Sequence, residues 1–167
     1  MSIWLFLLSQ FAIISYALVG GVFLAFSDFI MRSLAHTSGG VGAEAMQVIN
    51  KEVFRWVFMA LFLGLVPISV VLAVYGFLSL GTPAGTLFLL AAAIYLIGCF
   101  LVTVMFNVPM NEALAAMDTA SATTADYWSG TYVPRWTFWN SVRTAASTIA
   151  AALMLFGLLW MAQSQPA

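Results

Sequence analysis

The chain has little charge, and what it has is confined to two stretches. Only 7% of its 167 residues are charged, with five basic and six acidic side chains, whereas a soluble domain carries roughly 25%. All of these residues, and the single histidine, lie within Asp28–Arg55 and Glu112–Arg143. The net charge of −1 and the lack of a basic stripe argue against nucleic acid as a partner.

Cysteine and histidine are equally scarce. With Cys99 as the only cysteine, an intramolecular disulfide is excluded. The chain has no Glu-x-x-His pair for a di-iron site in a helical bundle, and one histidine excludes bis-histidine haem within a single chain. We therefore predict no cofactor. Metal or haem bound by His36, with Met31 or with a partner chain, is a minor alternative.

Hydrophobic residues make up 63% of the chain and form long runs. Each run is close to the ~17–25 residues that cross a bilayer as a helix. The runs are Ile3–Phe26, Phe54–Leu78, Leu87–Phe106 and Ala145–Met161. They predict an all-α fold, a four-helix transmembrane bundle with antiparallel up-down topology and short extra helices in the charged loops. We expect one membrane domain, residues 1–167, with spans at about 3–28, 54–80, 87–108 and 136–161.

The basic residues predict how the bundle is oriented. They flank the first and third loops, whereas the second loop, Ser79–Gly85, has no charge. Basic loops favour the cytoplasmic side, so we expect the first and third loops in the cytoplasm and both termini outside. No basic residue precedes the first run and no small-residue cleavage site follows it, so we expect a retained helix rather than a signal peptide.

Polar residues recur at helical spacing near the charged end. In F-S-D-F-I-M, Phe26–Met31, Ser27 and Met31 share one side of a helix. Asp28 and Arg32 share another side, either as an interfacial ion pair or as ligand contacts.

Two pairs of amide-bearing residues add to this pattern. Gln47 and Asn50 precede the second span on an expected helix, where they could orient a ligand or bond backbone at a helix junction. Asn107 and Asn111 flank Pro109 and either line a site or heal a kink.

The entry to the fourth span, W-T-F-W-N-S-V-R-T, is the richest motif. Trp136, Asn140 and Arg143 recur on one helical face. Trp139 fits an interfacial anchor or a substrate contact. Arg143 lies inside the helix, so we expect it to have a buried partner. The polar groups expected to converge at one end of the bundle are Ser27, Asn50, Asn107, Asn111, Asn140 and Arg143.

The motifs F-S-D-F-I-M-R-S-L, A-M-Q-V-I-N, N-V-P-M-N and W-N-S-V-R-T, in this order, resemble the anthrone-oxygenase-like family of small membrane proteins over about residues 20–151. The resemblance implies an oxygenase or oxidoreductase that acts on a planar, apolar anthrone- or quinone-like substrate, with dioxygen as co-substrate and no organic cofactor. We assign oxyanion stabilisation to Arg143, Asn107, Asn111 and Asn140. Asp28 is a candidate base, with Glu112 or His36 as alternatives. The predicted substrate contacts are Ser27, Met31, Gln47, Asn50, Trp136 and Trp139.

Two positions depart from the family pattern. Many relatives have histidine where Ser141 stands and proline where Arg32 stands. If that histidine is a base or metal ligand, this chain lacks the activity or uses another group. Whether the chain is an enzyme therefore stays open. The alternatives are a non-catalytic membrane protein that binds a lipid, a quinone or a partner helix, and a transporter component, which the lack of mid-span charge disfavours.

Small residues within the spans predict close packing between helices. They are Gly20, Gly21, Gly64 and Gly157. Glycine lets helix backbones approach one another in a membrane, so a homo-oligomer formed through these positions is a further expectation.

Overall fold

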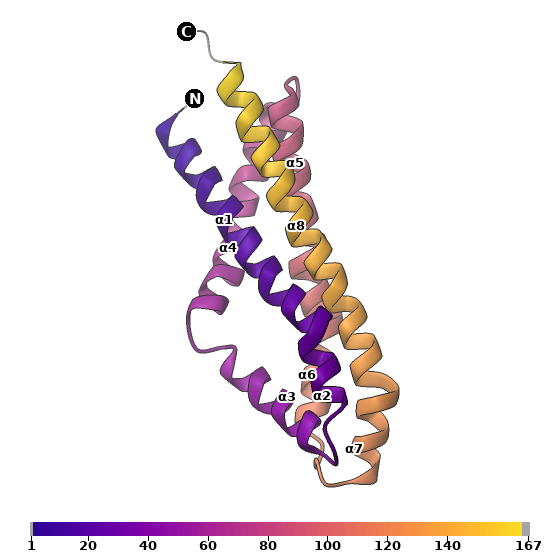
Figure 1. The fold of residues 1–167 in the computed structure, drawn as a ribbon. Helices are drawn as coiled ribbons and strands as arrows, with labels where there is room; N and C mark the ends of the chain where they lie inside the picture. Colours follow the sequence, from indigo (N-terminus) through magenta and orange to yellow (C-terminus); the bar gives the residue numbers. More distant parts are fainter. Residues whose placement is uncertain (1, 165–167) are drawn as a thin grey trace.

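The computed structural model describes residues 2–164 and contains four long helices (Figure 1). The first comprises α1 (Ile3–Ala25), the π-helical turn η1 (Phe26–Ile30) and α2 (Met31–Ala35). The second is α4 (Val57–Leu78), preceded by the short helix α3 (Val41–Glu52). The third comprises α5 (Pro83–Tyr95), the π turns η2 (Leu96–Leu101) and η3 (Thr103–Asn107), and α6 (Val108–Ala115). The fourth comprises α7 (Ala122–Tyr127), η4 (Trp128–Tyr132) and α8 (Val133–Gln163).

All four helices are long and apolar enough to cross a membrane, which confirms the predicted all-α transmembrane bundle. α1 and α5 each pack against both α4 and α8, so the four helices form a closed ring. The start of α1 and the end of α8 lie at one end of the bundle, and the connections α2–α3 and α6–α7 lie at the other (Figure 1). Thr82 caps α5 at the tight α4–α5 turn by accepting a hydrogen bond from the Gly85 amide at 3.0 Å.

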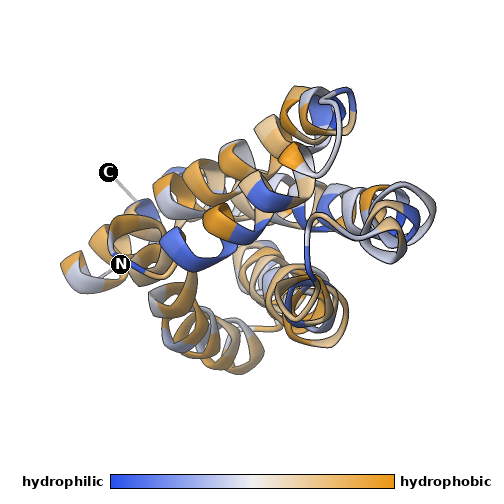
Figure 2. Ribbon diagram, turned by 90° about the horizontal axis from the view of Figure 1, so that it is seen from below, coloured by the Kyte–Doolittle hydropathy of each residue, from blue (hydrophilic) through white to orange (hydrophobic). Residues whose placement is uncertain are grey.

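The outer surface of the bundle is apolar, as a lipid-facing surface must be. Figure 2 looks onto the end with the charged loops, where hydrophilic residues gather, while the helices behind are mostly hydrophobic. Of the four glycines predicted to serve helix packing, two do so inside the bundle: a Cβ at Gly157 would lie 2.6 Å from the Phe88 ring, and one at Gly20 would lie 3.2 Å from Ser147 Cβ. Gly21 and Gly64 have no such neighbour within 4 Å, so the packing predicted for them does not occur within the chain.

Three of the four helices are longer than the membrane is thick. α4 has 22 residues, or about 33 Å at 1.5 Å per residue, close to the ~30 Å of the hydrocarbon core. The others have 33, 33 and 42 residues and extend beyond α4 at the charged end. This extension, together with α3, forms what we call the cap: α2, α3, α6, α7, η4 and the first turn of α8. It has its own hydrophobic core, which includes Met31, Met46, Leu114, Tyr132 and Trp136.

The cap contains the short helix predicted from A-M-Q-V-I-N, but the long helices run further than expected. The third continues through Pro109 to Ala115, because the wider turn η3 precedes the proline and the Val108 amide bonds the Thr103 carbonyl five residues back. The ion pair considered for Asp28 and Arg32 does not form: within residues 2–164 the only ion pair joins Arg55 and Glu52. Asp28 lies in η1, where the wider turn changes the side that each residue faces.

Candidate functional site

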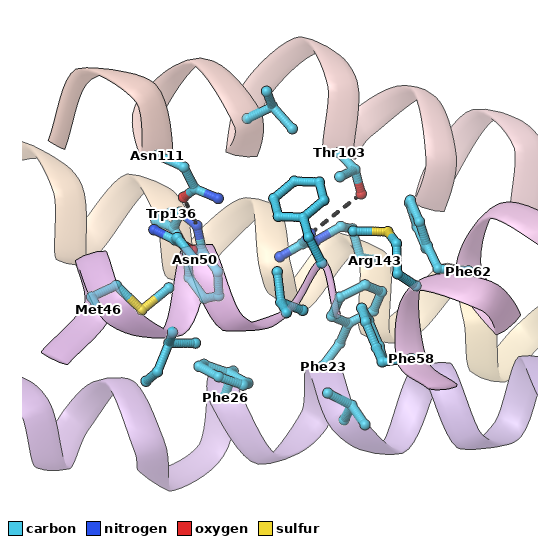
Figure 3. Close-up of a pocket in the computed structure, with 16 residues that line it drawn as sticks. Phe23, Phe26, Met46, Asn50, Phe58, Phe62, Thr103, Asn111, Trp136 and Arg143 are labelled. Carbon is cyan, nitrogen blue, oxygen red and sulfur yellow. Dashed lines mark hydrogen bonds between the residues drawn. The ribbon is translucent and has the colours of Figure 1, made fainter. Parts of the chain in front are cut away.

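A cavity of about 100 Å³ lies where the cap meets the membrane-spanning part of the bundle. Its walls come from two hydrophobic cores. Phe23 and Phe62 belong to the core between the four long helices, and Met46 and Trp136 belong to the core of the cap (Figure 3). Most of the lining is aromatic or aliphatic. The polar side chains that line it are Asn50, Thr103, Asn111 and Arg143.

Arg143 is a buried cation without a carboxylate partner. Its side chain comes from α8, and only 4% of the residue is exposed. Nη2 donates to Asn140 Oδ1 at 2.6 Å and Nη1 donates to Thr103 Oγ1 at 3.3 Å, while Nε has no partner. The guanidinium carbon lies 4.1 Å from the centre of the Phe23 ring. Within residues 2–164 no acidic group lies within ion-pair distance of it.

Asn140 holds this guanidinium in place and joins α8 to α1. Its Nδ2 donates to the Phe23 carbonyl and to Ser27 Oγ, both at 2.6 Å. Ser27 belongs to the π turn η1, a feature that often accompanies functional sites. The Ser141 hydroxyl lies 3.0 Å from Ser27 Oγ on the exposed side. The oxygen and the nitrogen of the Asn140 side-chain amide together fix Arg143 against α1.

A second network orients the tryptophan wall. Asn111 Oδ1 accepts hydrogen bonds from Tyr132 Oη and Trp136 Nε1, both at 2.8 Å. Asn50 Nδ2 donates to the same tyrosine oxygen at 3.3 Å. The Trp136 ring packs beside Phe26, with 5.7 Å between ring centres. These bonds connect α3, α6 and α8 and fix the cap end of the cavity.

The predicted site residues separate into three groups by position. Asn50, Asn111, Trp136 and Arg143 line the cavity. Asn140, Ser27 and Asn107 lie behind its wall. The buried Asn107 donates from Nδ2 to the Trp136 carbonyl at 3.2 Å, and its Oδ1 has no partner.

The third group lies away from the cavity. Gln47 Nε2 donates to the Leu114 and Met117 carbonyls at 2.8 and 3.0 Å. Of the two roles considered for Gln47, this is the bonding of backbone at a helix junction. Met31 is buried in the cap core. Trp139 stacks on Phe106, with 3.7 Å between ring centres.

The groups considered as bases are all exposed. Asp28, Glu112 and His36 are solvent-accessible, and none of them lines the cavity. His36 is exposed to solvent, whereas Met31, considered with it as a ligand of metal or haem, is buried. Within residues 2–164 no group of three or more histidine, cysteine or acidic side chains is placed to hold a metal ion.

Sequence reasoning missed the aromatic floor of the cavity. Phe23, Phe58 and Phe62 read as ordinary members of hydrophobic runs. The spacing of Phe58 and Phe62, four residues apart, was the available signal that they share one side of α4. Tyr132 was missed as well, although it stands four residues before Trp136.

The cavity has a mouth between α1 and the α3–α4 turn. Two lining residues are exposed there, Val22 by 41% and Phe54 by 67%. The neighbouring Trp56 is 81% exposed, as befits an aromatic residue at a membrane interface. Since an engineered cavity of about 150 Å³ holds one benzene, a ligand of two or three rings must reach into the mouth or displace the flexible Met46 and Met59.

The family model described as anthrone oxygenase matches residues 54–153, which is more than half of the chain. No curated protein and no solved structure matches the chain. The matched region contains Thr103, Asn111, Trp136 and Arg143 of the lining, whereas α1 and α3 lie outside it.

Proposed function

We propose that this chain, which belongs to the anthrone oxygenase family, oxidises a planar, apolar aromatic substrate of anthrone or quinone type with dioxygen. The observation that carries the proposal is the buried guanidinium of Arg143, which has no counter-ion within residues 2–164 and lies on the wall of an aromatic cavity. Such a group stabilises negative charge that develops on a bound substrate.

The oxidation of an anthrone by dioxygen requires few catalytic groups from the protein. Removal of a proton from an anthrone gives an electron-rich anthrolate that can itself pass an electron to dioxygen. Overall, the methylene group loses two hydrogens and gains one oxygen atom as a carbonyl, and the second oxygen atom leaves as water. The protein must then hold the ring system, stabilise the oxyanion and admit dioxygen. No organic cofactor is needed for this balance.

The cavity supplies these elements from the residues that line it. Phe23, Phe58, Phe62 and Trp136 offer ring faces and edges for stacking on a planar substrate. Arg143 is the cationic donor, and Asn50 and Asn111 add amide groups at the cap end. Asn107 and Asn140, which the sequence suggested as oxyanion donors, do not line the cavity. In this proposal they position Trp136 and Arg143 through hydrogen bonds.

The mouth fits a substrate that arrives from the lipid. It lies beside the first residues of α4, where the membrane-spanning part of the bundle begins. An apolar substrate dissolved in the bilayer can thus enter without crossing water. The distribution of basic residues supports a cytoplasmic position for the cap and an outer position for both termini.

The test is turnover by the purified protein in lipid nanodiscs. We expect 1,8-dihydroxyanthrone to consume dioxygen and form the anthraquinone faster than in buffer or empty nanodiscs. Arg143→Gln should lower the rate by roughly 10²–10³-fold, the usual effect of losing one oxyanion donor. Arg135→Gln is the matched control, because Arg135 is an exposed arginine on the same helix. A rate equal to that of empty nanodiscs would refute the proposal.

A second candidate is a binding protein for the same class of ligand. It is favoured by the position of the acidic residues and of His36, all of which are exposed and outside the cavity lining. In that case the protein binds planar aromatic molecules in the cavity but gives no oxygen consumption above the autoxidation rate.

A further inference from the structure

The buried positive charge of Arg143 is not compensated by an acidic side chain within residues 2–164. Arg143 is the only charged residue among those that line the cavity. Burying an ion costs several kcal/mol unless an opposite charge compensates it. Its hydrogen-bond partners, the Asn140 amide oxygen and the Thr103 hydroxyl, are neutral and do not cancel the charge. Nε is buried and unpartnered.

We propose that the cavity binds its ligand as an anion, and that the negatively charged oxygen of a planar phenolate or enolate is the counter-ion of Arg143. This inference rests on the proposed function for the reaction, since an anthrolate is an anion of this class. It goes further in naming charge as the property that the cavity selects, so that acidic hydroxyquinones and anthrones are bound in preference to neutral quinones of the same size.

The guanidinium has the donors that such a ligand needs. Of its five N–H groups, one on each Nη is used by Thr103 and Asn140. Three remain, including the buried Nε–H. Asn140 and the Phe23 ring hold the guanidinium from two sides, so the donors are ordered before the ligand binds. Figure 3 shows Arg143 among the lining residues, with Phe23, Phe62 and Trp136 around it.

The ligand's proton has no acceptor on the cavity wall. The lining residues of α1, α3 and α4 carry no titratable group. Cys99 and Tyr132, a thiol and a phenol, do not line the cavity. The O–H or C–H bond of the ligand therefore breaks with its electron pair left on the ligand, and the proton passes to water at the membrane interface, where Trp56 lies beside the mouth. The ligand's own acidity decides whether it ionises.

A matched pair of ligands tests this selection. 2-Hydroxy-1,4-naphthoquinone is an anion at neutral pH, whereas 2-methyl-1,4-naphthoquinone has almost the same size and no ionisable group. Titration calorimetry on the detergent-purified protein measures both dissociation constants. We expect the hydroxy compound to bind roughly 10- to 100-fold more tightly, the range that a hydrogen bond to a charged group supports. Equal dissociation constants would overturn the inference.

Two kinds of variant locate the preference at Arg143. Arg143→Gln removes the charge and should make the two dissociation constants equal. Thr103→Asp keeps Arg143 but provides an internal carboxylate beside Nη1, and it should abolish the preference as well. Thr103→Asn, which has the same shape without the charge, should retain it. If Arg143→Gln does not fold, the two Thr103 variants provide the test. The same ratio of the two dissociation constants in Thr103→Asp and Thr103→Asn would contradict the proposal.

Binding and turnover fail independently. A preference for the anion without oxidation of 1,8-dihydroxyanthrone would refute the proposed function and support the anion site. Oxidation that depends on Arg143 without any preference for the anion would support the proposed function and refute the anion site.

Discussion

Asn111→Leu should destabilise the cap, because one amide oxygen satisfies two buried donors. Asn111 Oδ1 accepts from Tyr132 Oη and from Trp136 Nε1, both at 2.8 Å. Tyr132 is fully buried and Trp136 is 5% exposed, so water cannot easily replace the lost acceptor. An unsatisfied buried donor costs about 1–3 kcal/mol. Two such donors give an expected loss of about 2–6 kcal/mol.

A double-mutant cycle makes this reasoning specific. In the Asn111→Leu background, the Tyr132 hydroxyl is an orphaned donor, so Tyr132→Phe should remove part of the penalty. We therefore expect the double variant to be more stable than Asn111→Leu alone, although Tyr132→Phe by itself destabilises the wild type. The coupling energy should be about 1–3 kcal/mol, within the range for residues that share a hydrogen bond.

Thermal unfolding in detergent, followed by tryptophan fluorescence, measures the effect. With 2–4 °C per kcal/mol for chains of this length, Asn111→Leu should lower the unfolding temperature by on the order of 10 °C. An unchanged unfolding temperature would show that the two donors find other partners. Strictly additive effects of Asn111→Leu and Tyr132→Phe would show that the shared oxygen is not what couples them.

The remaining predictions concern packing, pH and access. Gly157→Ala places a Cβ 2.6 Å from the Phe88 ring and should lower stability by about 1–3 kcal/mol, whereas Gly64→Ala, which meets no atom within 4 Å, should not; thermal unfolding of both variants checks this. Because no acidic or imidazole side chain lines the cavity, the pH midpoint of turnover should shift with the acidity of the substrate when two anthrones are compared. A midpoint common to both would identify a titrating protein group instead. Val22→Trp should slow ligand association by narrowing the mouth, measured by stopped-flow fluorescence, while Val71→Trp on the exposed side of α4 should leave the association rate unchanged.

The sequence was sufficient for the four helices but not for their ends. Long apolar runs separated by two charged stretches leave few folds besides a transmembrane bundle. The predicted spans follow the apolar runs, whereas the helices of the structure continue beyond these runs through charged and polar residues, as at Met31–Ala35 and Val108–Ala115.

The candidate site was predictable only where the helix is regular. On α8 the ordinary helical repeat placed Trp136, Asn140 and Arg143 on one buried face, as the spacing indicated. On the first helix the π turn η1 changes the register, so the spacing of Asp28 did not reveal the direction it faces. The phenylalanines of the cavity could not be distinguished from lipid-facing ones, because both kinds of position require the same apolar side chains.

Local unfolding of the short helix α3 would let a ligand enter or leave the cavity without unfolding of the bundle. Helix α3 covers one side of the cavity with Met46, Ile49 and Asn50, and its main contacts are with α2 and α6, the cap ends of the first and third long helices. A helix of 12 residues is marginal by itself in water. We therefore expect it to open at a lower free energy than the membrane-spanning helices. Its backbone amides should exchange with deuterium sooner than those of α8, and each such opening uncovers the cavity while the four long helices stay folded.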